Sequence, residues 1–577
     1  MDKHEVAAIL DEIGVLLTLQ GENPFKIRAY HNAARAIEAL EEDLSTLIRE
    51  ERLTDVPGIG ERIGEKVKTL VLKGKLPYYE KLKKEIPPTL LELLKLPGLG
   101  GKKVQILYKK LKIRTTKELL NACKQGKIAR LAGFGKKTQE SLLQEIARMK
   151  NLGKRLLWWN AEEIALPILE AIRTFPHVQR AEIAGSLRRG LETVGDLDFL
   201  IATNHPAEVM LQCTKAPWVS KILASGESKL SIRLKQGLQA DFRIVSESQF
   251  AFAWLYFTGS KEHNIKMRTR ARQMGGSLSE YGFEPLQKSS IRKKLLRSEE
   301  EIFHVLQLDY IPPELREATG EIEAAEKHHL PHLIEEKDLR GVFHCHTTES
   351  DGHNTLEEMV AAANAFGWEY MGIADHSQSS FQANGMNEQR LLAQMERIRS
   401  WNRSKKSSIF LFAGLECDIL TQGKLDFPNS ILKKLDFVIA SVHRSFHIGE
   451  KNMTHRIIKA IENPYVTMLG HVTGRLLLRR DAYAVNLPKI IDACIANDTI
   501  MELNAHPMRL DMDWRLWHHA KEKGLKCSIN PDAHNTYDLA YVRAGINIAR
   551  KGWLEKSDVF NALSLAEVQA FLRKKKG

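Results

Sequence analysis

The sequence predicts a multidomain chain with three kinds of architecture. We expect an all-α N-terminal region, an α+β central domain with a helical extension, and a C-terminal distorted seven-stranded β/α barrel. A short glycine motif recurs between helical stretches, strand-like runs dominate residues 153–255, and seven short apolar runs alternate with helical stretches after residue 339. At 577 residues the chain is also too long for one hydrophobic core.

Composition restricts the partners and the environment that we expect. A formal net charge of +13 suits a polyanionic partner such as nucleic acid. The six cysteines are scattered without a CxxC pair, which is typical of reduced thiols in a cytosolic protein. The start of the chain lacks the apolar core of a signal peptide, and no apolar run is long enough to span a bilayer. We therefore expect a cytoplasmic protein that has no membrane partner and is a monomer.

The helical N-terminal region contains one motif three times: VPGIG at 56, LPGLG at 96 and LAGFG at 131. Each copy precedes lysine-containing helical residues, as a helix-hairpin-helix requires. The glycines allow a sharp turn that brings backbone N–H groups against a phosphate. The candidate DNA-binding glycines are Gly58, Gly60, Gly98, Gly100, Gly133 and Gly135. The third copy lacks proline, so a role in packing alone is the alternative for it. We expect one helical domain at 1–85 and a second at 86–152.

Residues 184–202, AGSLRRGLETVGDLDFLIA, combine a Gly-Ser turn, two arginines and two spaced aspartates. Side chains alternate faces along a strand, so Asp196 and Asp198 project from one side. Asp241 in ADFRIV can add a third carboxylate from a neighbouring strand. Such a triad suits two Mg²⁺ or Mn²⁺ ions that stabilise the attacking and leaving oxygens of a phosphoryl displacement. A surface strand with exposed acids is the alternative.

This segment resembles the signature of family X DNA polymerases, and YFTGSKEHNIKMR at 256–268 resembles that family's element against the incoming deoxynucleotide. The resemblance implies a nucleotidyltransferase palm at 153–255, a thumb at 256–315 and helical fingers at 86–152. It implies that Tyr256 and Phe257 lie beside the sugar and exclude a 2′-hydroxyl. The nucleotide contacts that we expect are Gly185, Ser186, Arg189, Gly195, Tyr256, Phe257, Gly259, Asn264 and Arg268. Gln239 departs from the arginine that some relatives have beside the third aspartate.

GIGERIGEKVKTL resembles the lyase-domain motif of repair members of the same family. Lys66 falls on the position of their Schiff-base lysine. Lys26 and Tyr30, in FKIRAY, match part of their 5′-phosphate pocket. A solvated helical lysine is the alternative for Lys66. Deoxyribose-phosphate lyase activity is therefore a hypothesis for domain 1–85.

After an acidic, proline-containing segment at 316–338, which we expect to be a linker, apolar runs end in candidate ligands. Chemistry at the C-terminal ends of strands is typical of a β/α barrel. The predicted ligands are His344, His346, Asp351, His376, Glu416, His443, His471, Asp532 and His534. Nine imidazole and carboxylate groups are too many for one ion, and three Mn²⁺, Zn²⁺ or Fe ions would suit them.

Residues 339–577 resemble a PHP (polymerase and histidinol phosphatase) domain, and all nine metal positions of that family are filled. The whole chain resembles bacterial and archaeal PolX, in which a family X polymerase is fused to a PHP domain. This resemblance implies repair synthesis at gapped or nicked DNA from deoxynucleoside triphosphates, 3′–5′ degradation of 3′-ended DNA by the barrel, and a nucleoid-associated location. Two alternatives are an RNA nucleotidyltransferase and a DNA-binding scaffold whose PHP domain is a small-molecule phosphatase.

Overall fold

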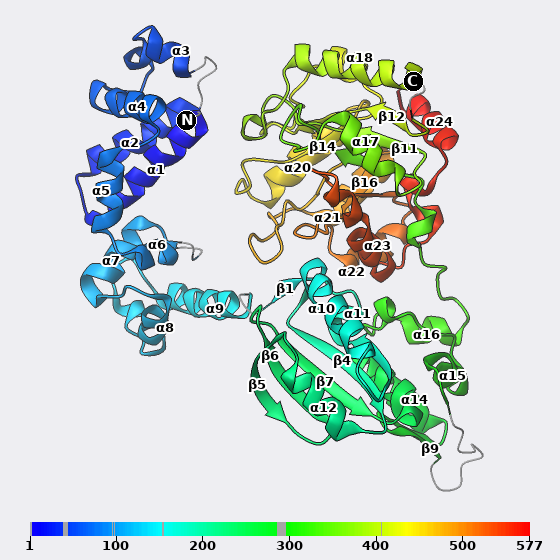
Figure 1. The fold of residues 1–577 in the computed structure, drawn as a ribbon. Helices are drawn as coiled ribbons and strands as arrows, with labels where there is room; N and C mark the ends of the chain where they lie inside the picture. Colours follow the sequence, from blue (N-terminus) through cyan, green and yellow to red (C-terminus); the bar gives the residue numbers. More distant parts are fainter. Residues whose placement is uncertain are drawn as a thin grey trace. The chain divides into compact units, whose positions relative to one another are not determined.

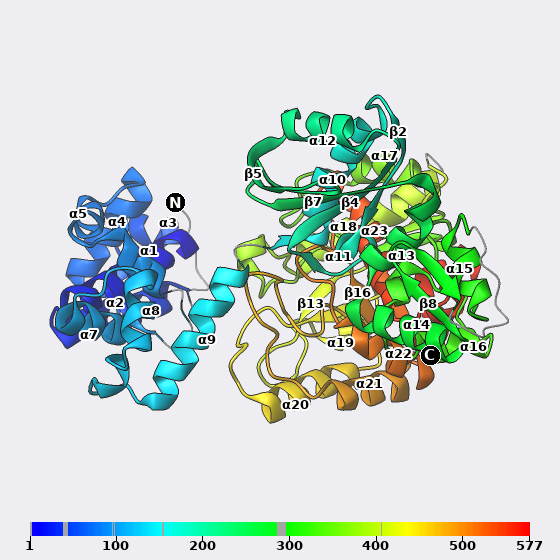
Figure 2. The same ribbon diagram turned by 90° about the horizontal axis from the view of Figure 1, so that it is seen from below.

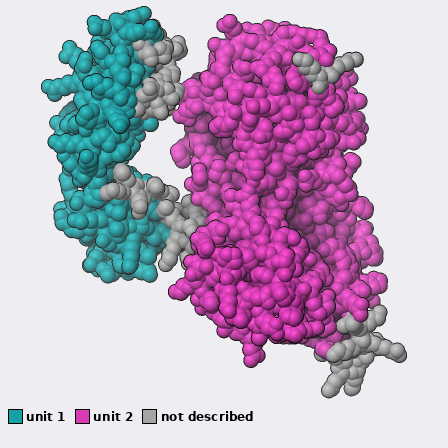
Figure 3. All heavy atoms as spheres, in the orientation of Figure 1, with its two compact units in different colours: residues 1–153 teal, residues 154–577 magenta. Residues whose placement is uncertain are grey.

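The structure is a computed structural model, drawn from two directions in Figure 1 and Figure 2. The chain divides into two compact units, residues 1–153 and 154–577, which Figure 3 colours separately. No helix among the described residues is long and apolar enough to cross a membrane. The described residues are 3–38, 44–94, 96, 99–152, 155–285, 296–404 and 407–576.

The first unit is helical throughout its described residues, as predicted. One core runs through it and includes Leu10, Val67 and Leu107, all almost fully buried, because the amphipathic helices turn their apolar faces inward. The helices are α1 (Lys3–Gln20), α2 (Pro24–Glu38), α3 (Leu44–Arg49), α4 (Glu61–Lys73), α5 (Pro77–Glu85), α6 (Pro88–Leu94), α7 (Gly101–Leu111), α8 (Thr116–Lys124) and α9 (Lys136–Leu152).

The second unit begins with a five-stranded sheet of order β2-β4-β7-β6-β5, in which only β4 and β7 are parallel. Phe199 and Phe242 stack under α10 and α12, whereas Leu200 and Ala202 pack on the opposite face against α13. These elements are β1 (Leu156–Leu157), α10 (Trp158–Arg173), β2 (Val178–Ala184), α11 (Gly185–Arg188), β3 (Thr193–Val194), β4 (Asp196–Thr203), α12 (Pro206–Lys215), β5 (Val219–Ser225), β6 (Lys229–Leu234), β7 (Gln239–Val245) and α13 (Phe250–Thr258).

The helical extension, the predicted thumb, packs around Phe252, Met267 and Phe303. Its elements are α14 (Lys261–Gln273), β8 (Gly276–Ser279), β9 (Gly282–Pro285), α15 (Glu299–Val305) and α16 (Glu321–Glu326).

The segment 316–338 is more ordered than a simple linker. Arg316 and Glu321 have no exposed surface, because Arg316 pairs with Glu299 at 2.7 Å and Glu321 with His263 at 2.8 Å. Its acidic composition therefore reflects buried ion pairs as well as solvated residues.

The C-terminal half is the predicted barrel. Its strands pair in parallel, and β12 and β13 are two parts of one run, which gives seven positions around the barrel. Bridges between His376 and Glu416 and between Cys345 and Ala533 close the ring. The strands are β10 (Gly341–Cys345), β11 (Tyr370–Ile373), β12 (Phe410–Ala413), β13 (Glu416–Asp418), β14 (Ile439–Ser441), β15 (Met468–Leu469), β16 (Ile500–Asn504) and β17 (Cys527–Asn530).

Helices cover the outside of this barrel (Figure 1). Aromatic side chains fill its interior, where Phe343 and Phe437 lie so close to Gly372 that a Cβ there would approach them within 2.5 and 2.7 Å. The helices are α17 (Leu356–Asn364), α18 (Glu388–Ser404), α19 (Asn429–Leu432), α20 (Glu450–Ile461), α21 (Leu487–Ala496), α22 (Trp514–Glu522), α23 (Val542–Lys551) and α24 (Leu565–Lys576).

Candidate functional site

All nine candidate ligands of the barrel come together at the C-terminal ends of its strands. Glu416 lies at their centre: Oε2 is 2.8 Å from Nδ1 of His376, and Oε1 is 2.8 Å from Nε2 of His471. The same Oε1 is 3.1 Å from Nε2 of His443, and Oε2 is 3.3 Å from Nε2 of His344. One carboxylate thus faces four imidazoles from four strand ends.

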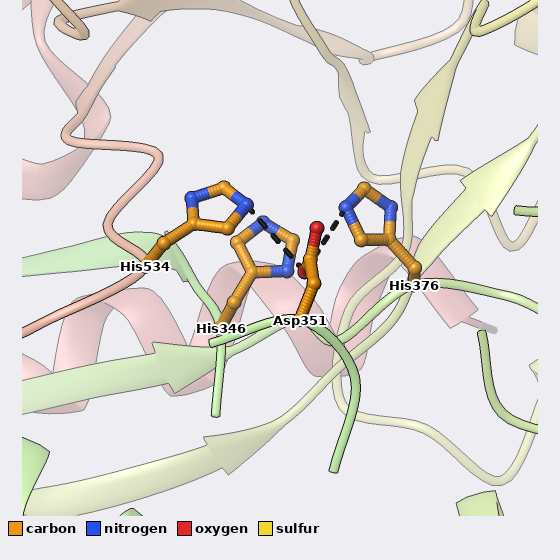
Figure 4. A group of neighbouring side chains, drawn as sticks. All are labelled: His346, Asp351, His376 and His534. Carbon is orange, nitrogen blue, oxygen red and sulfur yellow. Dashed lines mark ion pairs between the residues drawn. The ribbon is translucent and has the colours of Figure 1, made fainter. Parts of the chain in front are cut away.

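Two aspartates complete the cluster. Asp532 Oδ1 lies 3.3 Å from Nε2 of His346. Asp351 points between His376 and His534, at 3.6 and 3.5 Å from their Nε2 atoms (Figure 4). The turn that carries Asp351 therefore closes over the strand ends.

The arrangement of these atoms fits several metal ions. Ligand atoms within 4.8 Å of one another form three overlapping groups in the barrel. Nε2 of His344, both ring nitrogens of His346 and Oε2 of Glu416 are buried without a hydrogen-bond partner, which is costly unless a cation engages them. The three groups are His346, Asp351, His376 and His534; His344, His346 and Glu416; and His376, Glu416 and His443.

The charge states of the cluster also suit metal binding. Burial, together with the neighbouring His534 and His376, lowers the pKa of His346 to about 3, so this ring is neutral and offers the lone pair of one nitrogen. Burial alone would raise the pKa of Glu416, but its histidine neighbours hold it well below its usual value. Glu416 is therefore an anion that can bridge cations.

Sequence reasoning missed the residues that hold these ligands. Glu502 Oε1 lies 2.5 Å from Nδ1 of His344, which leaves Nε2 to face the cluster. Asp418 Oδ1 lies 3.1 Å from Nδ1 of His443, and Asn504 donates to Asp532 at 2.9 Å. The sequence does carry a signal for them, which is two polar residues two positions apart in a strand, as in IMELN (Glu502 and Asn504) and GLECD (Glu416 and Asp418).

Metal addition should stabilise the barrel. Because a bound ion would satisfy the buried unpartnered nitrogens, Mn²⁺ at a hundredfold excess over its Kd should add about 2.7 kcal/mol to the free energy of unfolding. Differential scanning calorimetry of metal-free protein with and without Mn²⁺ measures this. The His344→Ala/His346→Ala variant should lose most of the shift, and an equal shift in that variant would contradict the assignment.

The three aspartates of the predicted palm are the second candidate site. Asp198 lies opposite Asp241 on the parallel strands β4 and β7, and Asp196 is two residues before Asp198 on the face that packs against α13. Burial raises the pKa of Asp198 to about 7, with Asp196 and Asp241 contributing. Divalent cations relieve such repulsion between carboxylates, although these aspartates are not among the described groups whose ligand atoms lie within 4.8 Å.

Gly185 shows why a glycine precedes this site. Its φ is +65°, and a Cβ there would lie 1.9 Å from Oδ2 of Asp198. The Gly-Ser turn therefore runs directly beside the central aspartate. Gln239, in the position where some relatives have arginine, donates to Asp241 at 3.0 Å.

The expected nucleotide contacts fall into two places. Tyr256, Asn264 and Arg268 line one small cavity between α13, α14 and β8, and the amide of Asn264 donates to the carbonyl of Tyr256 at 2.7 Å. Phe257 packs edge-on against Tyr256. Arg189 lies at the C-terminal end of α13, beside Gly259, where it is held by Glu317 at 3.0 Å and by the carbonyl of Thr258.

In the first unit, Lys66 lies beside two tyrosine rings. Its Nζ is 5.9 and 5.3 Å from the ring centroids of Tyr30 and Tyr78, and it donates to the carbonyl of Arg62 at 2.9 Å. Burial lowers the pKa of Lys66, and the charges of Lys26 and Arg62 lower it further. This is the environment that makes a lysine nucleophilic.

The glycine motifs share one geometry. Gly60 and Gly100 begin α4 and α7 without a side-chain cap, so backbone N–H groups at these helix starts are available to a phosphate. Gly58 and Gly133 have φ of +99° and +82°, which makes the turn. Gly135 is exposed, like Gly60 and Gly100, and a Cβ at any of these three would meet nothing within 4 Å. Gly98 lies outside the described residues.

Comparison with known proteins matches four stretches of the chain to family models. The matching family models are the helix-hairpin-helix domain at 1–76, the SAM-like helix-hairpin-helix tandem at 90–148, the DNA polymerase beta thumb at 253–317 and the PHP domain at 343–506. The chain is 40% identical over 576 residues, and the full length of both, to the DNA polymerase/3′–5′ exonuclease PolX of Bacillus subtilis (strain 168).

The barrel alone resembles a second group of proteins. A probable phosphatase of Thermoanaerobacter sp. (strain X514) is 28% identical over 182 residues, which are 30% of this chain and 71% of the relative. A probable phosphatase of Caldicellulosiruptor saccharolyticus is 29% identical over 208 residues, 34% of this chain and 81% of the relative.

Proposed function

The chain belongs to the PolX family of DNA polymerase/3′–5′ exonucleases, and we propose that its palm aspartates and its barrel cluster divide those two reactions between them. The protein is a DNA polymerase with a 3′–5′ exonuclease activity, depends on divalent metals and binds DNA. Repair synthesis in short gaps is the role that its helix-hairpin-helix motifs and basic charge support best.

In the palm, Asp196, Asp198 and Asp241 would hold two Mg²⁺ or Mn²⁺ ions. Ions bound there would stabilise both the attacking 3′ oxygen and the leaving pyrophosphate. The observation that carries this assignment is the register of Asp198 opposite Asp241 on parallel strands, beside the turn of Gly185. Gly195, immediately before this strand, belongs to the same proposed pocket.

The other nucleotide contacts follow from the same placement. Gly185, Ser186 and Arg189 would bind the phosphate tail by backbone N–H, hydroxyl and guanidinium groups. Tyr256 and Phe257, with Gly259 after them, would exclude a 2′-hydroxyl. Primer extension on a one-nucleotide gap, with deoxy- and ribonucleotides compared, tests these roles. The same experiment tests whether gapped or nicked DNA is the substrate.

In the barrel, the nine ligands would hold up to three Mn²⁺, Zn²⁺ or Fe ions. Bound ions would polarise the terminal phosphodiester and lower the pKa of an attacking water. The protein orients the ligands: Glu502 fixes the ring of His344, Asp418 that of His443, and Asn504 the carboxylate of Asp532. Mn²⁺ should support degradation better than Mg²⁺, because imidazole ligands favour it.

A second activity for the barrel is favoured by its resemblance to the probable phosphatases. Such a barrel would also hydrolyse small phosphomonoesters at the same ions. Hydrolysis of p-nitrophenyl phosphate tests this candidate. The His344→Ala/His346→Ala variant should lose this activity together with exonuclease activity.

The full-length polymerase relative argues against the RNA nucleotidyltransferase alternative. We also propose that the protein is a monomer and that it lies in the cytoplasm, associated with the nucleoid.

Lys66 should form a Schiff base with an incised abasic site, with Lys26 and Tyr30 holding the 5′-phosphate. A lowered pKa raises the fraction of neutral amine, which is the form that attacks the sugar aldehyde. Borohydride should trap a covalent DNA adduct on the wild type, and Lys66→Ala should reduce trapping by at least about tenfold. Lys73→Ala, an exposed lysine on the same helix, is the matched control. Equal trapping in Lys66→Ala would remove this lysine from the mechanism.

A further inference from the structure

The palm turn that carries Arg189 rests on a helix of the barrel. Lys551, the last residue of α23, has a fully buried side chain. Its Nζ donates to the carbonyl of Arg189 at 3.1 Å and to the carbonyl of Glu314 at 3.2 Å, and it lies 2.7 Å from Oε1 of Glu317. A barrel lysine is therefore bonded to the backbone of a residue expected to bind nucleotide.

The same carboxylate oxygen also holds the side chain of Arg189. Nε of Arg189 lies 3.0 Å from Oε1 of Glu317, and Nη1 donates to the carbonyl of Thr258. Glu317 and Arg189 are each only 13% exposed. Within the described residues, Arg189 donates hydrogen bonds from Nε and Nη1 but not from Nη2, so the clamp fixes the guanidinium plane and leaves Nη2 available.

Two further contacts seat this turn on the barrel. Gly190 has a φ of +66°, and a Cβ there would lie 2.1 Å from Oδ1 of Asn547 on α23. Glu192 pairs with Arg475 at 2.6 Å, just beyond the strand end that carries His471. Arg189, Gly190 and Glu192 therefore each contact the barrel.

We propose that Lys551 is a positioning residue for the polymerase reaction, supplied by the nuclease barrel. By holding Glu317 and the carbonyl of Arg189, it orients the guanidinium toward the phosphates of the incoming nucleotide. This inference rests on the proposed role of Arg189 as a phosphate contact. It gives the barrel a part in nucleotide binding that is independent of its metal cluster.

The test is steady-state primer extension by the full-length protein at saturating gapped DNA, with nucleotide concentration varied. Lys551→Met should raise KM for the nucleotide about tenfold and leave kcat within about threefold, because a misplaced guanidinium weakens phosphate binding. Exonuclease activity should not change. Arg543→Met is the matched control, since Arg543 lies on the same helix and also bridges to the palm, but to Glu162 at 2.9 Å. Arg543→Met should leave KM at the wild-type value.

A double-mutant cycle separates this inference from the proposed function. If Lys551 acts through Arg189, Lys551→Met should add nothing to the KM of Arg189→Met. A raised KM in Arg189→Met with an unchanged KM in Lys551→Met overturns the inference alone. An unchanged KM in Arg189→Met overturns both. If Lys551→Met also loses exonuclease activity, Glu317→Gln decides: it should raise KM equally, and an unchanged KM refutes the inference.

Discussion

Replacing Asp198 by asparagine should reduce nucleotide addition by at least about a thousandfold and leave degradation of a 3′ end unchanged. Asp198 is the central carboxylate of the palm, opposite Asp241 and two residues from Asp196. Asparagine has nearly the same shape but lacks the negative charge that a divalent ion requires. Because we propose that the two activities lie in different domains, only one should fail.

The measurement is gap filling and 3′-end degradation by one preparation of each variant. Glu182→Gln is the matched control, because it removes a carboxylate from the neighbouring strand β2, where Glu182 pairs with Arg173 at 3.1 Å. It should leave both activities near the wild-type level. Normal extension by Asp198→Asn would show that the palm aspartates are not the polymerase site.

Replacing His344 and His346 together by alanine should reduce exonuclease activity by at least about a thousandfold, while gap filling persists. Both rings are fully buried and contribute to the group that includes Glu416. Their loss removes two ligands, leaves Glu502 without its imidazole partner and takes two imidazole neighbours from Asp532. The expected product of the wild type is a 5′-mononucleotide, released faster from unpaired ends.

Product analysis on a labelled 3′ end, with Mn²⁺ supplied, measures this effect. His455→Ala/His519→Ala is a matched double control, because both histidines are exposed on barrel helices. Degradation that survives in His344→Ala/His346→Ala, or that is lost in Asp198→Asn instead, would place the nuclease elsewhere.

Residue patterns that repeat every two to four positions predicted the helices and strands and the residues at their ends. Alternation along β4 placed Asp196 and Asp198 on one side, and the structure puts both on the face of the sheet that packs against α13. Parallel strands of a barrel end on one side, so nine ligands at strand ends had to meet. Three of the candidate glycines, Gly60, Gly100 and Gly135, are exposed at the starts of helices, as the motifs predicted.

The sequence by itself thus determined the fold class and the candidate ligands, because strand alternation, helix periodicity and turn glycines act between near neighbours in the chain. The tertiary structure alone decided which residues hold those ligands and which domains touch. Glu502 reaches His344 across 158 residues, and Lys551 reaches Arg189 across 362. An unpaired charge inside a protein is too costly, so each buried charge pairs with a residue that folding brings next to it. Because that residue can be distant in the chain, no local sequence pattern encodes it.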